Sequence, residues 1–155
     1  MQCPALAGHH FVIEPMKIRP ATDSDLEHVE ALLRDARLPL EGARDAFRVG
    51  FVAEEHGAIV GAVALEMYPD SALLRSLVVD QAAQGKGLGG RLTQAAIEEA
   101  QRRRVHTIYL LTTTAEQFFP RFGFVAVDRQ SMPPSIQGSI EFRSACPASA
   151  IAMRR

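Results

Sequence analysis

Apolar residues recur every three or four positions in two segments, and this spacing predicts two amphipathic helices. The first is expected over residues 25–37, after an N-cap at Thr22 that forms a capping box with Asp25. The second is expected over residues 89–104. The apolar positions that repeat at helical spacing are Leu26, Val29, Leu33 and Ala36 in the first helix, and Leu92, Ala96 and Ala100 in the second.

Shorter apolar runs between these helices predict strands. Residues 48–68 hold two strands joined by a turn at His56-Gly57, and a short helix is expected at 114–119. The other expected strands cover 17–21, 71–79, 105–112 and 123–127, with a last strand at Ser139–Arg143. The resulting order, β–α–βββ–α–β–α–β–β, predicts an α+β fold with a mixed central sheet of about six to seven strands and helices on both faces.

The length of 155 residues favours one domain. Met16 opens a segment typical of a domain start, so residues 1–15 are expected to be a poorly ordered extension and residues 16–155 a single domain. With a net charge of −1, the chain is not expected to bind nucleic acid or an anionic membrane surface. The two cysteines, Cys3 and Cys146, show no metal-ligand spacing, so we expect no metal. They lie near opposite ends of the chain, and two isolated cysteines without a signal-peptide pattern predict reduced thiols and a cytoplasmic location.

A cluster of glycines lies between the strand at 71–79 and the second helix. The spacing Gly85-x-Gly87-x-x-Gly90 matches a dinucleotide-binding loop, whereas Gln84-x-x-Gly87-x-Gly89 matches the phosphate loop of acetyl-CoA-dependent transferases. The dinucleotide interpretation requires a parallel βαβ unit and an acidic residue after the next strand. Here three antiparallel strands precede the loop and only threonines follow that next strand, which disfavours NAD.

The segments "LLRSLVVDQAAQGKGLGGRL" and "TTTAEQFFPRFGF" resemble two motifs of the GCN5-related N-acetyltransferase (GNAT) family. The resemblance covers roughly residues 16–143. Within that family, "LLRSLVV", "YLLTTTA", "PPSI" and "CPASA" are similar to small acetyltransferases of arsenic-resistance operons, and "LTTTA…FF…GF" is similar to N-acetylglutamate synthases.

This resemblance implies a GNAT fold and transfer of acetyl from acetyl-CoA to a primary amine of a small molecule, which is amino-acid-like or a toxicant. It also implies that a homodimer can form, because small members of the family often pair. The alternative is a CoA-binding regulatory module without catalysis, and an NAD-dependent oxidoreductase is a third hypothesis.

The expected cofactor contacts come mostly from one continuous segment. Backbone N–H groups of the glycine loop would hold the pyrophosphate of CoA, with added charge from Lys86, and the strand before it would pair with the pantetheine arm. An N–H of Val78 or Val79 would polarise the thioester carbonyl. The residues assigned to the cofactor are Leu77, Val78, Val79, Gln84, Gly85, Lys86, Gly87, Leu88, Gly89, Gly90, Thr112 and Phe118.

The proton-transfer groups common in the family are missing, because Leu73 and Phe119 occupy their positions. Glu66 is the candidate base, acting through water, and Tyr68 is a weaker candidate. Arg75 has the strand parity of Leu77 and Val79, which predicts a side chain on their face, where it could bind an acceptor carboxylate. Glu141 and Arg143, on the expected last strand, are further candidates for the acceptor pocket.

Overall fold

The computed structural model of the protein describes residues 16–145 and 147–155. The expectations for residues 1–15 and for Cys3 and Cys146 fall outside the described residues. Over the described part, no helix is long and apolar enough to cross a membrane.

A seven-stranded mixed sheet forms the centre of the molecule, with the strand order β1-β2-β3-β4-β5-β7-β6. The strands are β1 (Lys17–Pro20), β2 (Gly50–Glu55), β3 (Ala58–Met67), β4 (Ala72–Val79), β5 (Ile108–Thr112), β6 (Val125–Val127) and β7 (Ile151–Arg154). All neighbours pair antiparallel except β4 and β5, which are parallel. This arrangement confirms the expected α+β fold and its antiparallel meander of β2, β3 and β4, which is incompatible with a dinucleotide-binding unit.

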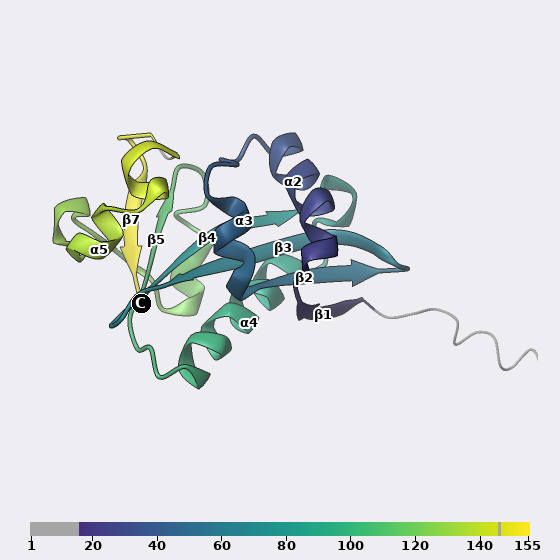
Figure 1. Cartoon of the computed structure of the whole chain (residues 1–155), viewed down its shortest axis with the longest axis horizontal. Coiled ribbons are helices and arrows are strands. Elements are labelled where there is room, and N and C mark those ends of the chain that lie inside the picture. The colour runs from purple at the N-terminus through teal and green to yellow at the C-terminus, as the bar shows by residue number, and fades with distance from the viewer. Residues whose placement is uncertain (1–15, 146) are drawn as a thin grey trace, which may run out of the picture.

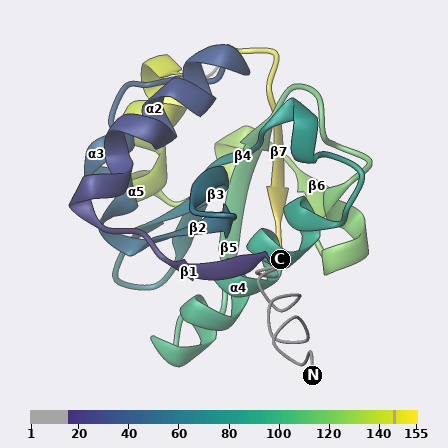
Figure 2. The same ribbon diagram turned by 90° about the vertical axis from the view of Figure 1, so that its right-hand side faces the viewer.

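Helices cover both faces of the sheet (Figures 1 and 2). Helix α2 (Leu26–Asp35) and helix α3 (Ala43–Ala46) lie on one face, and α4 (Leu88–Arg102) lies on the other. The capping box at Thr22 and Asp25 is present and precedes α2, as expected. The described residues form three hydrophobic clusters: one beneath α4 around Leu92 and Ile97, one beneath α2 around Val29 and Leu33, and one around Leu73 and Ile136.

Two expected elements near the C-terminus are wrong. The strand expected at Ser139–Arg143 does not exist: helix α5 (Pro134–Gln137) is followed by a π-helix at Glu141–Ala145, and the last strand is β7. Proline at the start of α5 favours a helix there, and β7 is only four residues long, held by β5 and β6 rather than by a local pattern. The helix expected at 114–119 is instead a 3₁₀-helix at Phe119–Phe122, shifted towards Pro120, which fits the first turn of a helix.

A bulge in β4 separates this strand from β5. On β3, Ala62 pairs with Val78 and Ala64 pairs with Arg75, so β4 contains one extra residue at this point, and Ser76 adopts the left-handed backbone region at φ +60°. The parallel pairing of β4 with β5 is confined to Ala72 and Leu73. The rest of β4 therefore leaves one backbone edge unpaired where the two strands diverge.

Candidate active site

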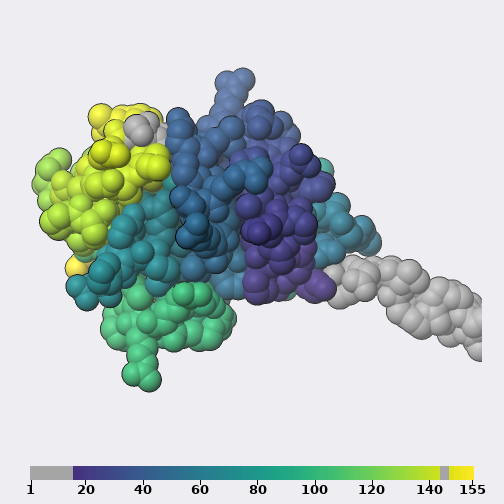
Figure 3. Space-filling model, viewed as in Figure 1, coloured from purple at the N-terminus to yellow at the C-terminus, as the bar shows by residue number. Residues whose placement is uncertain are grey.

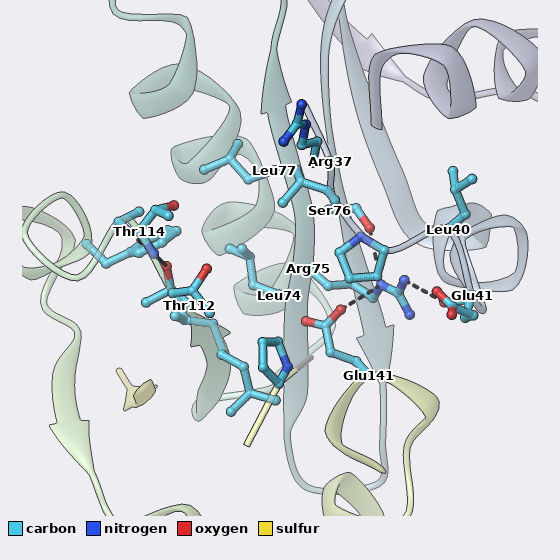
Figure 4. A pocket seen from close by; sticks show the side chains of 18 of the residues that line it. Arg37, Leu40, Glu41, Leu74, Arg75, Ser76, Leu77, Thr112, Thr114 and Glu141 are labelled. Carbon is cyan, nitrogen blue, oxygen red and sulfur yellow. Dashed lines mark hydrogen bonds and ion pairs between the residues drawn. The ribbon is translucent and has the colours of Figure 1, made fainter. Parts of the chain in front are cut away.

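A cavity of about 640 Å³ lies where β4 and β5 diverge. Three parts of the chain line it: the end of α2 with the following loop, the middle of β4, and the segment from β5 to Ala115 (Figure 4). Phe119, Glu141 and Pro147 complete the wall. Figure 3 shows the C-terminal segment, in yellow, lying against the segment around α3 on this side of the molecule. The cavity is large enough for a small-molecule ligand.

The glycine loop lies directly beyond the end of β4 and leads into α4. Gly85 and Gly87 have φ values of +86° and +80°, a backbone region that L-residues with a Cβ adopt only at a cost. The N–H groups in the first turn of α4 have no carbonyl partners within the helix and carry the positive end of its dipole. Lys86 is an exposed side chain 3.5 Å from Glu55, while Leu88 is buried. The loop therefore has the geometry of an anion-binding helix start.

The unpaired edge of β4 offers polar backbone groups to an extended ligand. The Asp80 N–H donates to the carbonyl of Val60 on β3, at 2.8 Å. Because successive N–H groups of a strand point to opposite edges, the Val79 N–H points toward the diverging β5. The Val79 carbonyl agrees with this orientation, since it accepts a hydrogen bond of 3.1 Å from the Gln84 side chain instead of a β3 donor. Of the two expected N–H groups, Val79 is thus the better oriented, while the Val78 side chain packs in the core beneath α2.

Two more expected cofactor residues lie beside this edge. Thr112 lines the cavity, but its hydroxyl already accepts from the Ala115 N–H at 2.9 Å and so closes the turn after β5. Phe118 is outside the cavity wall and packs near the loop, 3.6 Å from where a Cβ on Gly89 would lie. The neighbouring Phe119 lines the cavity and carries no ionisable group.

Arg75 is the centre of a buried charge cluster. Its side chain is fully buried and donates from Nη1 to Glu66 at 3.0 Å and from Nη2 to the carbonyl of Glu41 at 2.7 Å. Its Nε lies 3.2 Å from the Ser76 hydroxyl and 3.4 Å from Glu141 (Figure 4). One arginine thus forms ion pairs with two carboxylates and ties β4 to β3, to the loop before α3 and to the π-helix.

The strand-parity argument for Arg75 is wrong. Leu77 and Val79 pack on the core beneath α4, whereas Arg75 contacts Glu41 and lies 3.1 Å from where a Cβ on Gly42 would be, on the side of α3. The bulge at Ser76 inserts one residue and reverses the alternation of faces. Because each guanidinium nitrogen already has a protein partner, the geometry argues against Arg75 as the binder of an acceptor carboxylate.

Glu66 and Tyr68 lie together but outside the main cavity. The Tyr68 hydroxyl donates to Glu66 at 2.7 Å, and burial together with this hydrogen bond raises the pKa of Tyr68. Both residues line a second, shallower hollow of about 390 Å³ beside α3. Two acidic residues line the main cavity, Glu41 and Glu141, and of these Glu41 is exposed whereas Glu141 is buried.

The π-helix separates the two remaining acceptor candidates. Glu141 is buried and lines the cavity, but Arg143 is exposed and absent from its wall. Because the expected strand does not form, the alternation that would have placed Glu141 and Arg143 on the same face does not apply.

Sequence reasoning missed the contribution of the loop after α2. Arg34, Arg37 and the segment 38–41 form one wall of the cavity. The signal present in the sequence was Leu38-Pro39, which marks the helix end but gives no hint that this end faces β4. Within the described residues, no three His, Cys, Asp or Glu side chains gather in an arrangement that could hold a metal ion.

Proteins of known structure and a curated relative are similar to this chain. An N-acetyltransferase of uncharacterised function from Chlorobaculum tepidum is 29% identical over 98 residues, and the match covers 63% of each chain. N-acetylglutamate synthase from Neisseria gonorrhoeae, solved with coenzyme A and N-acetyl-glutamate, aligns with a TM-score of 0.78 and 22% identity. That alignment covers 92% of this chain but only 35% of the synthase.

A Mycobacterium tuberculosis protein solved in complex with CoA aligns over 89% of this chain and 97% of its own, with a TM-score of 0.76 and 22% identity. At these identities the solved structures establish the fold alone. The profile of the Acetyltransferase (GNAT) domain matches residues 47–126, which is 80 of the 155 residues and includes β4, the glycine loop and α4. The protein therefore belongs to the GNAT acetyltransferase family.

Proposed function

We propose that the protein is an acetyl-CoA-dependent N-acetyltransferase that acts on a primary amine of a small, amino-acid-like molecule. The observation that carries the proposal is a cavity between β4 and β5 with an unpaired strand edge and a buried carboxylate in its wall, next to a glycine loop that follows the end of β4. The fold shared with N-acetylglutamate synthase and the resemblance to acetyltransferases of arsenic-resistance operons support an amino-acid-like acceptor, including a toxicant.

In the proposed complex the pyrophosphate of CoA binds at Gly85–Gly90, and the pantetheine arm pairs with β4 at Leu77–Val79. The N–H of Val79 is oriented toward a ligand carbonyl on this edge. A donor placed in this way stabilises the negative charge that develops on the thioester oxygen during attack.

The acceptor enters as an ammonium, loses one proton, and its nitrogen attacks the thioester carbon. The C–S bond then breaks, the amide nitrogen loses a second proton, and the thiolate of CoA is protonated. In our proposal Glu141 replaces Glu66 as the group that receives the first proton, directly or through water, because Glu141 is in the cavity wall. The thiolate can leave without a protein acid because the pKa of its conjugate thiol is only about 8.5.

A second candidate is a CoA-binding regulatory module. The buried Leu73 and Phe119, at positions where related enzymes carry proton-transfer groups, favour it.

The proposal of an enzyme also includes a cytoplasmic location, supported by two isolated cysteines without a disulfide framework, and a homodimer in solution.

Release of CoA thiol from acetyl-CoA, measured over a panel of amino acids and simple amines, separates the two candidates. Turnover with at least one primary amine is expected. Tight binding of acetyl-CoA without turnover on any amine would instead establish the regulatory module.

A further inference from the structure

Three arginines line the main cavity, and they differ in how their charges are used. The guanidinium of Arg75 is buried and occupied by Glu66, Glu141 and the carbonyl of Glu41. The side chains of Arg34 and Arg37 are exposed, and neither forms a hydrogen bond or ion pair with the residues that the structure describes. The cavity therefore contains cationic groups that an anionic ligand can still bind, and they come from the end of α2.

Backbone hydrogen bonds fix the main chain of Arg37 at this helix end. It occupies the left-handed position of a Schellman motif at φ +60°, in which the Leu38 N–H donates to the carbonyl of Leu33 at 2.9 Å and the Arg37 N–H donates to that of Arg34 at 3.0 Å. Glycine is favoured at such a position, so an arginine here carries a conformational cost. Arg34 lies in the last turn of α2, where its charge complements the helix dipole.

Arg104 provides an internal comparison for Arg37. It ends α4 in the same motif at φ +63°, with the Val105 N–H donating to the carbonyl of Ala100 at 2.9 Å, but it is not part of the cavity wall. The backbone strain alone therefore does not distinguish Arg37. Its position in the wall of the cavity does.

The charges of the cavity are separated along its wall. Figure 4 shows the Arg37 guanidinium directed away from the Arg75 cluster, while Glu141 belongs to that cluster. An acceptor with a positive amine and a negative group could place the amine near Glu141 and the negative group near Arg37. A plain amine would satisfy only the first of these contacts.

We infer that Arg37 binds the carboxylate of the acceptor and is the residue that selects amino acids over amines that lack a carboxylate. This inference rests on the proposed function and assigns the contact first expected of Arg75 to a different arginine. A guanidinium and a carboxylate form a charge-assisted, bidentate pair, which gives both affinity and orientation.

The test measures thiol release with acetyl-CoA and three pairs of acceptors: L-glutamine, L-methionine and L-phenylalanine, each beside the amine that its α-decarboxylation gives, which has no carboxylate. For an amino acid that is turned over, Arg37→Ala is expected to raise KM about tenfold or more. It should leave KM for acetyl-CoA and for the decarboxylated amine unchanged. Arg37→Lys should recover part of the loss, and Arg104→Ala, at the matched helix end, should change none of these constants.

Two results would overturn the inference while leaving the enzyme in place: an unchanged KM for amino acids in Arg37→Ala, or an increase in KM for acetyl-CoA, which would assign Arg37 to the cofactor. If the wild-type protein turns over no acceptor, the proposed function fails separately. The same amino acids are then titrated by calorimetry into protein saturated with CoA. Absence of binding that depends on Arg37 overturns the inference in that case as well.

Discussion

The two halves of the candidate active site are built on different principles. The half assigned to the cofactor uses backbone groups of one continuous segment, from Leu77 to Gly90, and its geometry depends on glycine dihedral angles and on a strand edge. The half assigned to the acceptor is held together by one buried arginine, Arg75, which binds groups from three other segments: the side chains of Glu66 and Glu141 and the carbonyl of Glu41. The first half is suited to a constant ligand, and the second can change its acceptor through a few side chains.

The largest effect is expected from removal of Arg75, on which the acceptor half depends. Arg75→Ala leaves the buried carboxylate of Glu141 and the partly buried carboxylate of Glu66 without their shared cation, and should lower the free energy of unfolding by about 3–5 kcal/mol. Chemical denaturation measures this loss. Arg143→Ala, an exposed arginine of the same C-terminal segment, is the control and should stay within about 0.5 kcal/mol of the wild type. Equal effects of the two substitutions would show that the cluster is not needed for stability.

The next effect distinguishes the two carboxylates of the cluster. Glu141→Gln is expected to lower kcat about 100-fold, because the amide cannot accept the proton of the ammonium, with KM for acetyl-CoA unchanged. Glu66→Gln should lower kcat far less, since Glu66 lines the second hollow beside α3. Steady-state kinetics with a single amine acceptor measure both variants. A larger decrease in kcat for Glu66→Gln than for Glu141→Gln would assign the role of base to Glu66.

A smaller effect tests the cofactor half through its backbone. Gly87→Ala places a Cβ at φ +80°, where there is open space but an unfavourable dihedral angle, so the loop should shift and CoA should bind about tenfold more weakly. Gly57→Ala, in the hairpin between β2 and β3, has the same φ of +80° and also open space. Gly57→Ala should lower the free energy of unfolding by a similar amount but leave the affinity for CoA, measured by calorimetry, unchanged. Equal CoA affinities in the two variants would argue against a phosphate site at the loop.

The smallest effect concerns the edge of the charge cluster. Tyr68→Phe removes the hydrogen bond to Glu66 and should cost about 1 kcal/mol of unfolding free energy at neutral pH. The pKa of Tyr68 is raised in the folded protein by burial and by this hydrogen bond, so its contribution is complete below the unfolded-state value of about 10. Above that pH the wild type should lose stability, because the unfolded chain releases this proton first. Between about pH 9 and pH 11, the free energy of unfolding measured by chemical denaturation should fall less in Tyr68→Phe than in the wild type. An identical fall in the two proteins would contradict this role of Tyr68.

The difference between the two halves also explains which parts could be predicted from the sequence. Helix and strand periodicity predicted α2, α4 and the meander of β2, β3 and β4, and the glycine spacing predicted the loop, because these features are written in neighbouring residues. The position of β7 and the π-helix at Glu141–Ala145 were missed, since β7 depends on pairing with β5 and β6 across the fold. The bulge at Ser76 reversed the expected face of Arg75, and a single inserted residue leaves no clear mark in the pattern.

The sequence by itself determined the family, the order of most elements and the segment that is proposed to hold CoA. A cofactor site made of backbone groups requires only particular dihedral angles in adjacent residues, and glycine specifies these locally. Only the tertiary structure decided which charges are buried together, that Arg75 is occupied by Glu66 and Glu141, and that the end of α2 faces the cavity with Arg37. Burial and ion pairing depend on residues distant in the chain, and so they exist only once the sheet and its two helical layers have assembled.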